Sequence, residues 1–318
     1  MKPNPYERRH QVQQSAIKAD QVEYNSIKNG PTPVDAGFYT ERVAGAMDDF
    51  GPDDPLITED WQQDDLRIED AVGQIHEQIL RRMEILKDSY PFELKSGTLK
   101  YKGRSTRSNR NPGPIYEFLL AICSAESLTR NAYTQLPRVF ERVSAQLIAA
   151  YFGEHVRSIH VGFPRDSNVG TSFKEAMKYV SHHTGEWAWG PDDGLPDEPA
   201  QGDAGCDFIA WPDTLDGRRI GQLFILGQCA CGNNWEDKLS DLNLKELSKW
   251  FNPLSVVTPV RTFTTPFYVT DVLLREVSRK AGLFFDRARL TLLSKKYKKA
   301  IANSLLRKMD KSIELVFS

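Results

Sequence analysis

The stretch "GQLFILGQCACGNNWEDK", residues 221–238, joins an apolar run to two cysteines and a polar turn. Its first half has the continuous apolar character of a buried β-strand, and that strand ends near Gln228. After Gly232 and two asparagines, the pattern predicts a helix over residues 235–250 with leucines on its apolar side. The stretch therefore predicts a buried strand that ends in polar groups and is followed by a helix.

Three further elements lie before this strand. Residues 135–153, "QLPRVFERVSAQLIAAYFG", predict an amphipathic helix, because the apolar side chains form one stripe and Gly153 suits the end. Residues 155–164 predict a strand rich in β-branched side chains, and residues 206–211, "CDFIAW", predict another. With further strands predicted in residues 255–269, the order helix, three strands, helix, strand indicates a mixed α/β core.

The flanking segments predict a two-part organisation. Residues 1–113 form an N-terminal helical region, in which the first 48 residues are a loose arm or a late-docking helix. This region also carries an acidic linker and the basic loop "KSGTLKYKGRSTRSNRNPG", residues 95–113, whose Gly, Ser and Asn content favours mobility. Residues 114–318 hold the α/β core and end in a basic helix.

Composition narrows the class of protein. No apolar stretch is long enough to span a bilayer, and the N-terminus has no apolar signal segment, so a cytoplasmic protein is expected. Four cysteines are too few for a disulfide framework, which favours a reducing compartment. The formal net charge is −2, yet basic residues cluster in residues 95–113 and 275–311. These clusters indicate a polyanionic partner, with ordinary solvated surface as the alternative.

Three short motifs carry a resemblance to a known family. They are "FE" at residues 140–141, "GCD" at residues 205–207 and "QCA" at residues 228–230. With their order and element types, residues 135–250 resemble the PD-(D/E)xK nuclease superfamily, and most of all its Mrr-type restriction endonuclease branch. The resemblance implies a restriction-endonuclease-like mixed sheet flanked by helices. It also implies hydrolysis of DNA phosphodiester bonds with Mg²⁺ or Mn²⁺, in prokaryotic restriction or phage defence.

The resemblance assigns metal-binding roles to three residues. Asp207 at a strand start is the first ligand, Glu141 joins it from the neighbouring helix, and Gln228 offers an amide oxygen. Because Mg²⁺ prefers oxygen ligands and keeps several waters, one or two carboxylates are sufficient. Ordinary alternatives stay open, namely a surface ion pair for Glu141, a capping role for Asp207, and bonding to backbone groups for Gln228.

The chain departs from the family at Ala230, where relatives usually have a catalytic lysine. Lys238 is the candidate replacement, since side chains in a first helical turn lean toward the N-terminus and the strand end. A solvated Lys238 is the alternative. A zinc site is disfavoured, because Cys229 and Cys231 supply only two ligands and point to the face opposite Gln228.

The expected DNA contacts are basic side chains of the two clusters. They are Lys100, Lys102, Arg104, Arg107, Arg110, Arg287, Arg289, Lys295, Lys296, Lys298 and Lys299. For Arg287 and Arg289, ion pairing with Asp286 and neighbouring acids is the alternative. Three functions stay open: an active nuclease, a DNA-binding or scaffold subunit of a defence complex that has lost cleavage, and an interaction protein without a nucleic-acid role. The expected partners are DNA, other subunits of such a complex and further copies of the chain.

Overall fold

The computed structural model describes residues 5–36, 61–103, 114–185, 187–189, 205–219, 221–242, 244, 251–253 and 257–318. The helices are α1 (Pro5–Lys28), α3 (Trp61–Leu86), η2 (Lys87–Ser89), α4 (Ile115–Ser124), η3 (Asn131–Thr134), α5 (Gln135–Phe152), α6 (Phe173–Thr184), η4 (Trp235–Lys238), α8 (Asp271–Ala281), α9 (Arg287–Lys296) and α10 (Asn303–Phe317). The strands are β1 (Thr32–Pro33), β2 (Phe92–Lys95), β3 (Thr98–Tyr101), β4 (Val156–His160), β5 (Trp187–Trp189), β6 (Phe208–Pro212), β7 (Ile225–Cys229), β8 (Phe251–Pro253), β9 (Val260–Thr264) and β10 (Leu283–Phe285).

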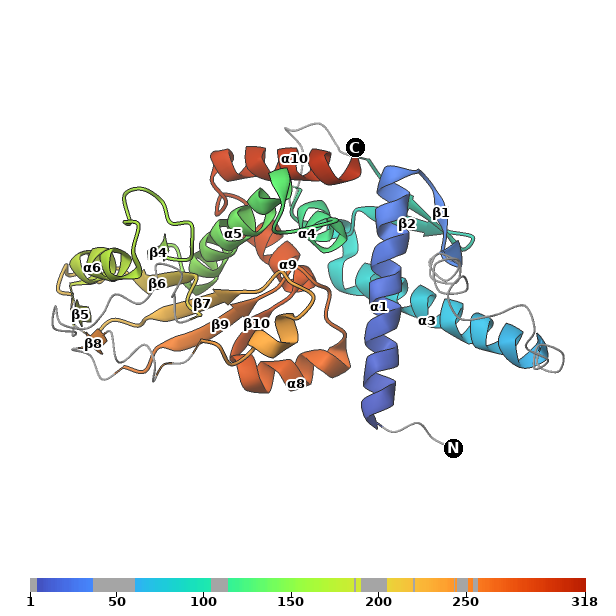
Figure 1. The fold of residues 1–318 in the computed structure, drawn as a ribbon, viewed down its shortest axis with the longest axis horizontal. Helices are drawn as coiled ribbons and strands as arrows, with labels where there is room; N and C mark the ends of the chain where they lie inside the picture. Colours follow the sequence, from blue (N-terminus) through green and yellow to red (C-terminus); the bar gives the residue numbers. More distant parts are fainter. Residues whose placement is uncertain are drawn as a thin grey trace.

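A five-stranded mixed sheet forms the centre of the fold, in the order β10-β9-β7-β6-β4 (Figure 1). Strand β6 runs antiparallel to both of its neighbours, β4 and β7, whereas β7, β9 and β10 run parallel. Phe208 on β6 lies opposite Gly227 on β7, and a Cβ atom on Gly227 would lie only 1.9 Å from that ring. The predicted mixed α/β class is confirmed, and a separate three-stranded antiparallel sheet, β1-β3-β2, accompanies the central sheet.

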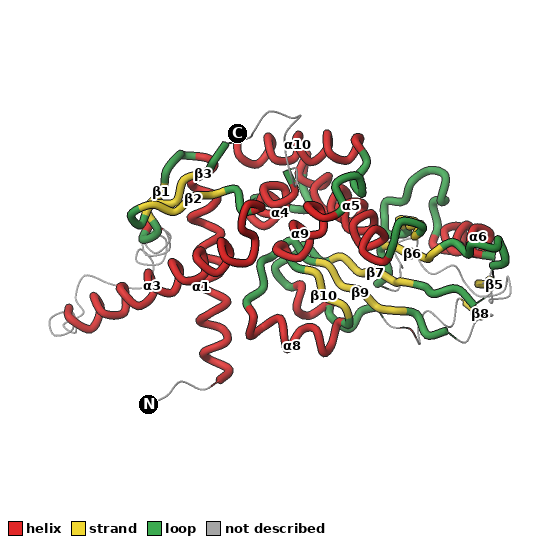
Figure 2. The backbone as a smooth tube through the Cα atoms, turned by 180° about the vertical axis from the view of Figure 1, so that it is seen from behind, coloured by secondary structure: helices red, strands yellow, loops and turns green. Residues whose placement is uncertain are grey.

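Helices cover both faces of the central sheet. Helices α5 and α9 pack on one face together with Phe208 and Ile225, while α4 and α10 complete that apolar layer. Helices α6 and α8 cover the other face, where Ile209 and Leu226 contact α6. Figure 2 shows α5 and α10 on one side of the sheet and α8 on the other, from behind. Because successive side chains of β6 and β7 enter different apolar clusters, both faces are buried and the strands read as continuous apolar runs.

The N-terminal helices are joined to the C-terminal half by buried charges. Arg287 of α9 is fully buried and donates two hydrogen bonds of 2.8 Å to the carboxylate of Asp20 on α1. Arg82 of α3 is also fully buried and pairs with Asp20 and Glu23, each at 2.7 Å. Burial acts to lower the pKa of Arg287, but Asp20 and other acidic groups hold that pKa well above its usual value. We call Asp20, Glu23, Arg82 and Arg287 the buried charge cluster.

Several expectations about the flanking segments are corrected. The N-terminal arm is the helix α1, and the first part of the basic loop is the β2–β3 hairpin rather than a mobile loop. The C-terminal basic helix is divided into α9 and α10, and the short strand β10 precedes α9. The helix predicted over residues 235–250 begins as a short 3₁₀ helix, η4, followed by turns at residues 239–241, and Leu244 is again helical. In the described part of the chain, no helix combines the length and apolarity needed to cross a membrane.

Candidate functional site

Three polar side chains meet where β4 ends and β6 begins. His160 is the last residue of β4 and lies opposite Phe208 at the start of β6, so Asp207 comes close to the end of β4. Glu141 reaches the same place from α5, which packs against both strands. Antiparallel pairing therefore brings together residues that are far apart in the sequence. We call Glu141, His160 and Asp207, with Gly162 beside them, the carboxylate site.

The three side chains all approach Gly162 closely. An ideal Cβ atom built on Gly162 would lie 2.9 Å from Asp207 Oδ1, 3.2 Å from His160 Nε2 and 3.3 Å from Glu141 Oε2. The Gly162 N–H donates to the Asp207 carbonyl oxygen at 2.9 Å, which fixes this approach. The backbone of Gly162 is not in the left-handed region. A glycine suits this position because a Cβ atom would meet the three polar atoms, and not because of an unusual backbone conformation.

Asp207 is held by the neighbouring strand. Its Oδ2 accepts a hydrogen bond of 2.6 Å from the Cys229 N–H, and its own N–H donates to the Gly227 carbonyl at 2.8 Å. Gly205 has a φ of +71°, and a Cβ there would lie 2.7 Å from the carbonyl carbon of Asp241. This glycine thus permits the close backbone approach expected beside Asp207. One carboxylate oxygen is fixed on β7 while the other faces Gly162.

Glu141 and His160 form a buried pair. His160 Nε2 lies 2.7 Å from Glu141 Oε2, and the two side chains are only 4% and 14% exposed, respectively. Sequence motifs assign His160 no role, because a single histidine in a strand has no diagnostic spacing. The signal that identifies it is the β4–β6 register, which is a tertiary feature.

The side chain of Gln228, expected to bind a metal ion, makes a hydrogen bond to a backbone group. It is 4% exposed, and its Oε1 accepts a hydrogen bond of 3.4 Å from the Leu242 N–H. Bonding to a backbone group at a buried strand end was the alternative left open for this residue. Ala230 is 1% exposed and packs with Trp235 and Leu239 in an apolar cluster, so it brings no polar group to the site.

Lys238, Glu141 and Asp207 all affect the pKa of one buried thiol, that of Cys231. Burial raises the pKa of Cys231 well above its usual value, Glu141 and Asp207 raise it further, and Lys238 lowers it. The pKa of Cys229 is likewise raised by burial and by the two carboxylates. Burial therefore disfavours the thiolate form of both cysteines. Lys238 is exposed at the end of η4, within electrostatic reach of this end of the sheet.

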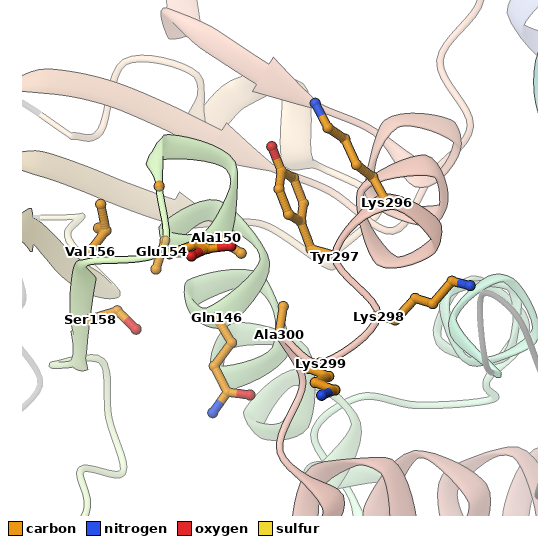
Figure 3. Close-up of a pocket in the computed structure, with 12 residues that line it drawn as sticks. Gln146, Ala150, Glu154, Val156, Ser158, Lys296, Tyr297, Lys298, Lys299 and Ala300 are labelled. Carbon is orange, nitrogen blue, oxygen red and sulfur yellow. The ribbon is translucent and has the colours of Figure 1, made fainter.

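The basic side chains fall into separate places. Lys296, Lys298 and Lys299 are exposed around a cavity of about 690 Å³ between the end of α5, the start of β4 and the α9–α10 connection (Figure 3). In that view Lys296 and Lys298 point in different directions, so the three lysines form a basic rim rather than a focused pocket. Lys295 lies 3.8 Å from Asp88.

The remaining expected DNA contacts differ in exposure. Arg287 belongs to the buried charge cluster, so the expectation that it contacts DNA is corrected, and its partners are acids of α1 rather than Asp286. Arg289 is exposed and donates to the Phe284 carbonyl. Lys100 is exposed on β3, and Lys102 donates to the Tyr90 carbonyl at 2.8 Å. Arg104, Arg107 and Arg110 lie outside the described residues.

The carboxylate site fits a cation that keeps much of its water. Among the described residues, no group of three or more His, Cys, Asp or Glu side chains is arranged to hold a metal ion. Two carboxylate oxygens, Glu141 Oε2 and Asp207 Oδ1, approach Gly162 from different elements, and Mg²⁺ is a cation that uses one or two carboxylates together with several waters. Comparisons of the chain with protein-family models, curated proteins and solved structures found no match.

Proposed function

We propose that the protein is a Mg²⁺- or Mn²⁺-dependent endonuclease that hydrolyses DNA phosphodiester bonds in prokaryotic restriction or phage defence. The observation that carries the proposal is the convergence of Glu141 and Asp207 at Gly162. The element order supports it as well. Helix α5 is followed by the antiparallel strands β4, β6 and β7 and then by β9 parallel to β7. This order agrees with the restriction-endonuclease-like core that the PD-(D/E)xK resemblance implies.

In this proposal, Asp207 and Glu141 hold the cation and Gln228 has a supporting role. A bound Mg²⁺ neutralises developing negative charge and makes a water more acidic. Asp207 presents Oδ1 because Oδ2 is fixed by the Cys229 N–H. Gln228 holds the backbone of Leu242, and thereby the segment that follows Lys238.

Lys238 is proposed to contact the phosphate that reacts. A positioned cationic donor stabilises the charge that develops in the transition state, which is the role of the lysine missing at Ala230. The effect of Lys238 on the pKa of Cys231 supports this role, because Glu141 and Asp207 affect the same thiol. Lys238 is exposed, so its ammonium group is accessible to a phosphate from solvent.

The basic rim is proposed to hold DNA by its phosphates. Gln146 and Ser158 line the cavity and lie on the same elements as Glu141 and His160. Five residues along α5 correspond to a rise of about 7.5 Å, so the cavity and the carboxylate site are built on the same helix and strand. Reversing the charges of the rim should flatten the salt dependence of DNA binding by about 0.9 log unit for each phosphate that is no longer neutralised. The variant reverses the three rim lysines, Lys296, Lys298 and Lys299, together with the neighbouring Lys295.

The matched control for this variant is Lys178→Glu, which changes an exposed lysine on α6. An unchanged slope of log affinity against log salt in the rim variant would remove the rim from the interface. Lys100, Lys102, Arg104, Arg107, Arg110 and Arg289 remain further candidate contacts.

A cleavage assay on plasmid and single-stranded DNA tests the proposed activity. Asp207→Asn should abolish Mg²⁺-dependent cleavage and leave DNA binding intact, because this change removes a ligand charge without changing the shape of the side chain. Asp213→Asn is the control, since Asp213 follows the other end of β6 and forms an ion pair with Arg157. Cleavage by Asp207→Asn at the wild-type rate would refute the assignment of the site.

A second candidate function is a DNA-binding or scaffold subunit of a defence complex without cleavage activity. The observation that favours it is Ala230, which is 1% exposed in an apolar cluster where relatives usually place a lysine. Wild-type protein that binds DNA in a salt-dependent manner, but cleaves no DNA with either Mg²⁺ or Mn²⁺, would support this second function.

A further inference from the structure

We infer that His160 is a positioning residue that holds the Glu141 carboxylate in one orientation beside Asp207, ready to bind the divalent cation. The inference rests on the proposed function and adds a residue that the family resemblance does not assign. It begins from the 2.7 Å separation between His160 Nε2 and Glu141 Oε2. This distance is typical of a hydrogen bond in which one partner is charged.

Burial strengthens the hydrogen bond between His160 and Glu141 and so favours one orientation of the Glu141 carboxylate. The side chains of His160 and Glu141 are 4% and 14% exposed, so water has little access to the bond between them. Hydrogen bonds are electrostatically stronger in such surroundings than in water. A carboxylate at this position without a donor would lack the partner that a buried charge needs. An apolar residue in place of His160 would pack in the strand but would leave Glu141 without this donor.

The other ring nitrogen indicates which atom carries the hydrogen. His160 Nδ1 is buried and has no hydrogen-bond partner among the described residues. Buried acceptors without partners are more common than buried N–H groups without partners. The ring hydrogen is therefore placed on Nε2, where it is donated to Glu141 Oε2. His160 thus acts through Nε2 as a donor to the carboxylate.

The donor has a specific task because two carboxylates share one space. Glu141 Oε2 and Asp207 Oδ1 both lie within 3.3 Å of the same point beside Gly162. Like charges at such separations repel each other and favour rotation of one side chain away from the site. Asp207 is fixed by the Cys229 N–H, and His160 gives Glu141 the equivalent restraint. Each proposed ligand therefore has its own donor.

Metal affinity is the property that separates positioning from simple packing. Loss of an outer hydrogen-bond partner of a metal ligand typically weakens metal binding about 10–100-fold. We expect His160→Leu to weaken Mn²⁺ binding by that factor, measured by calorimetry and by the electron paramagnetic resonance signal of free Mn²⁺. His160→Gln should stay within a few-fold of wild type, because its side-chain amide can donate from nearly the same position. The control His155→Leu, an exposed histidine just before β4, should have no effect.

The outcomes separate this inference from the proposed function. Wild-type protein that binds no Mn²⁺ would overturn both. Wild-type binding that is unchanged in a folded His160→Leu variant would overturn the role of His160 alone. If His160→Leu does not fold, His160→Asn is compared with His160→Gln, because the shorter amide cannot reach Glu141 Oε2 from the position of Nε2. His160→Asn should then weaken Mn²⁺ binding about 10–100-fold while His160→Gln stays within a few-fold of wild type, and equal affinities of the two folded variants would overturn the role of His160.

Discussion

Substituting Gly162 by alanine places one methyl group in the space shared by the carboxylate site. The new Cβ would lie 2.9 Å from Asp207 Oδ1, closer than Cβ atoms come to their neighbours in proteins, so the carboxylate must move. The contacts of 3.2 Å with His160 and 3.3 Å with Glu141 are also tight and require shifts of a few tenths of an ångström. Metal–ligand distances tolerate about 0.2 Å. We therefore expect Mg²⁺-dependent cleavage to fall about 100-fold or more.

The cost of this substitution in folding should be small by comparison. An extra methylene in a packed region destabilises by about 1–3 kcal/mol, and alanine returns roughly 0.4–1 kcal/mol by restricting the unfolded chain. The backbone of Gly162 accepts alanine because it is not left-handed. The assays are cleavage of plasmid DNA, Mn²⁺ binding and urea unfolding of the same preparation. Gly73→Ala is the control, since a Cβ on that α3 residue has no atom within 4 Å.

A large loss of activity and Mn²⁺ binding with a small loss of stability would agree with a space reserved for the cation and its water. Gly162→Ala protein that cleaves DNA and binds Mn²⁺ like wild type would refute this reasoning, because the methyl group would then occupy a space that the reaction does not use. A variant that fails equally in all three assays would indicate misfolding, and Gly162→Ser should then be worse still.

Three other changes test separate parts of the molecule. Lys238→Ala should slow single-turnover cleavage about 100-fold without weakening DNA binding, and Lys238→Arg should not restore the rate fully. Arg287→Met should lower the free energy of unfolding in urea by about 3–5 kcal/mol, because it leaves the buried carboxylate of Asp20 without one of its arginine partners, whereas the exposed Arg275→Met should have little effect. The pKa of Glu175 is lowered from 4.5 to about 2 by backbone hydrogen bonds from Ser172 and Thr171. Its stabilisation is therefore complete above pH 4.5 and is lost as the pH falls toward 2, so Glu175→Gln should flatten the acid limb of melting temperature against pH.

The elements with the strongest periodicity were predictable from the sequence. Helix α5 has a long apolar stripe, and β6 and β7 have apolar runs bounded by turn residues. The β2–β3 hairpin was not predicted, because its short strands are rich in lysine and the glycine-containing turn between them reads as a loop. The helix predicted over residues 235–250 was wrong at its start, where a 3₁₀ helix and turns form, while Leu244 is helical.

The candidate site was predictable only in its carboxylates. Glu141 and Asp207 lie in motifs that can be compared with a family, and the structure brings them to one space. His160 became visible only through strand pairing, which no local pattern specifies. Arg287 was misassigned because a basic cluster in the sequence does not distinguish a surface arginine from a buried one, and its partner Asp20 is 267 residues away.

The sequence distance between Asp20 and Arg287 has a consequence for folding during translation. The ribosome completes Asp20 and Glu23 long before Arg287, so α1 must wait for almost the whole chain before its second guanidinium partner exists. Burying those acids with only Arg82 would leave a net negative charge in the interior, so the final docking of α1 is expected to occur late. A nascent chain that stops early would keep α1 undocked and open to proteases. The buried charge cluster would then act as a quality check, which favours survival of chains that have been translated through α9.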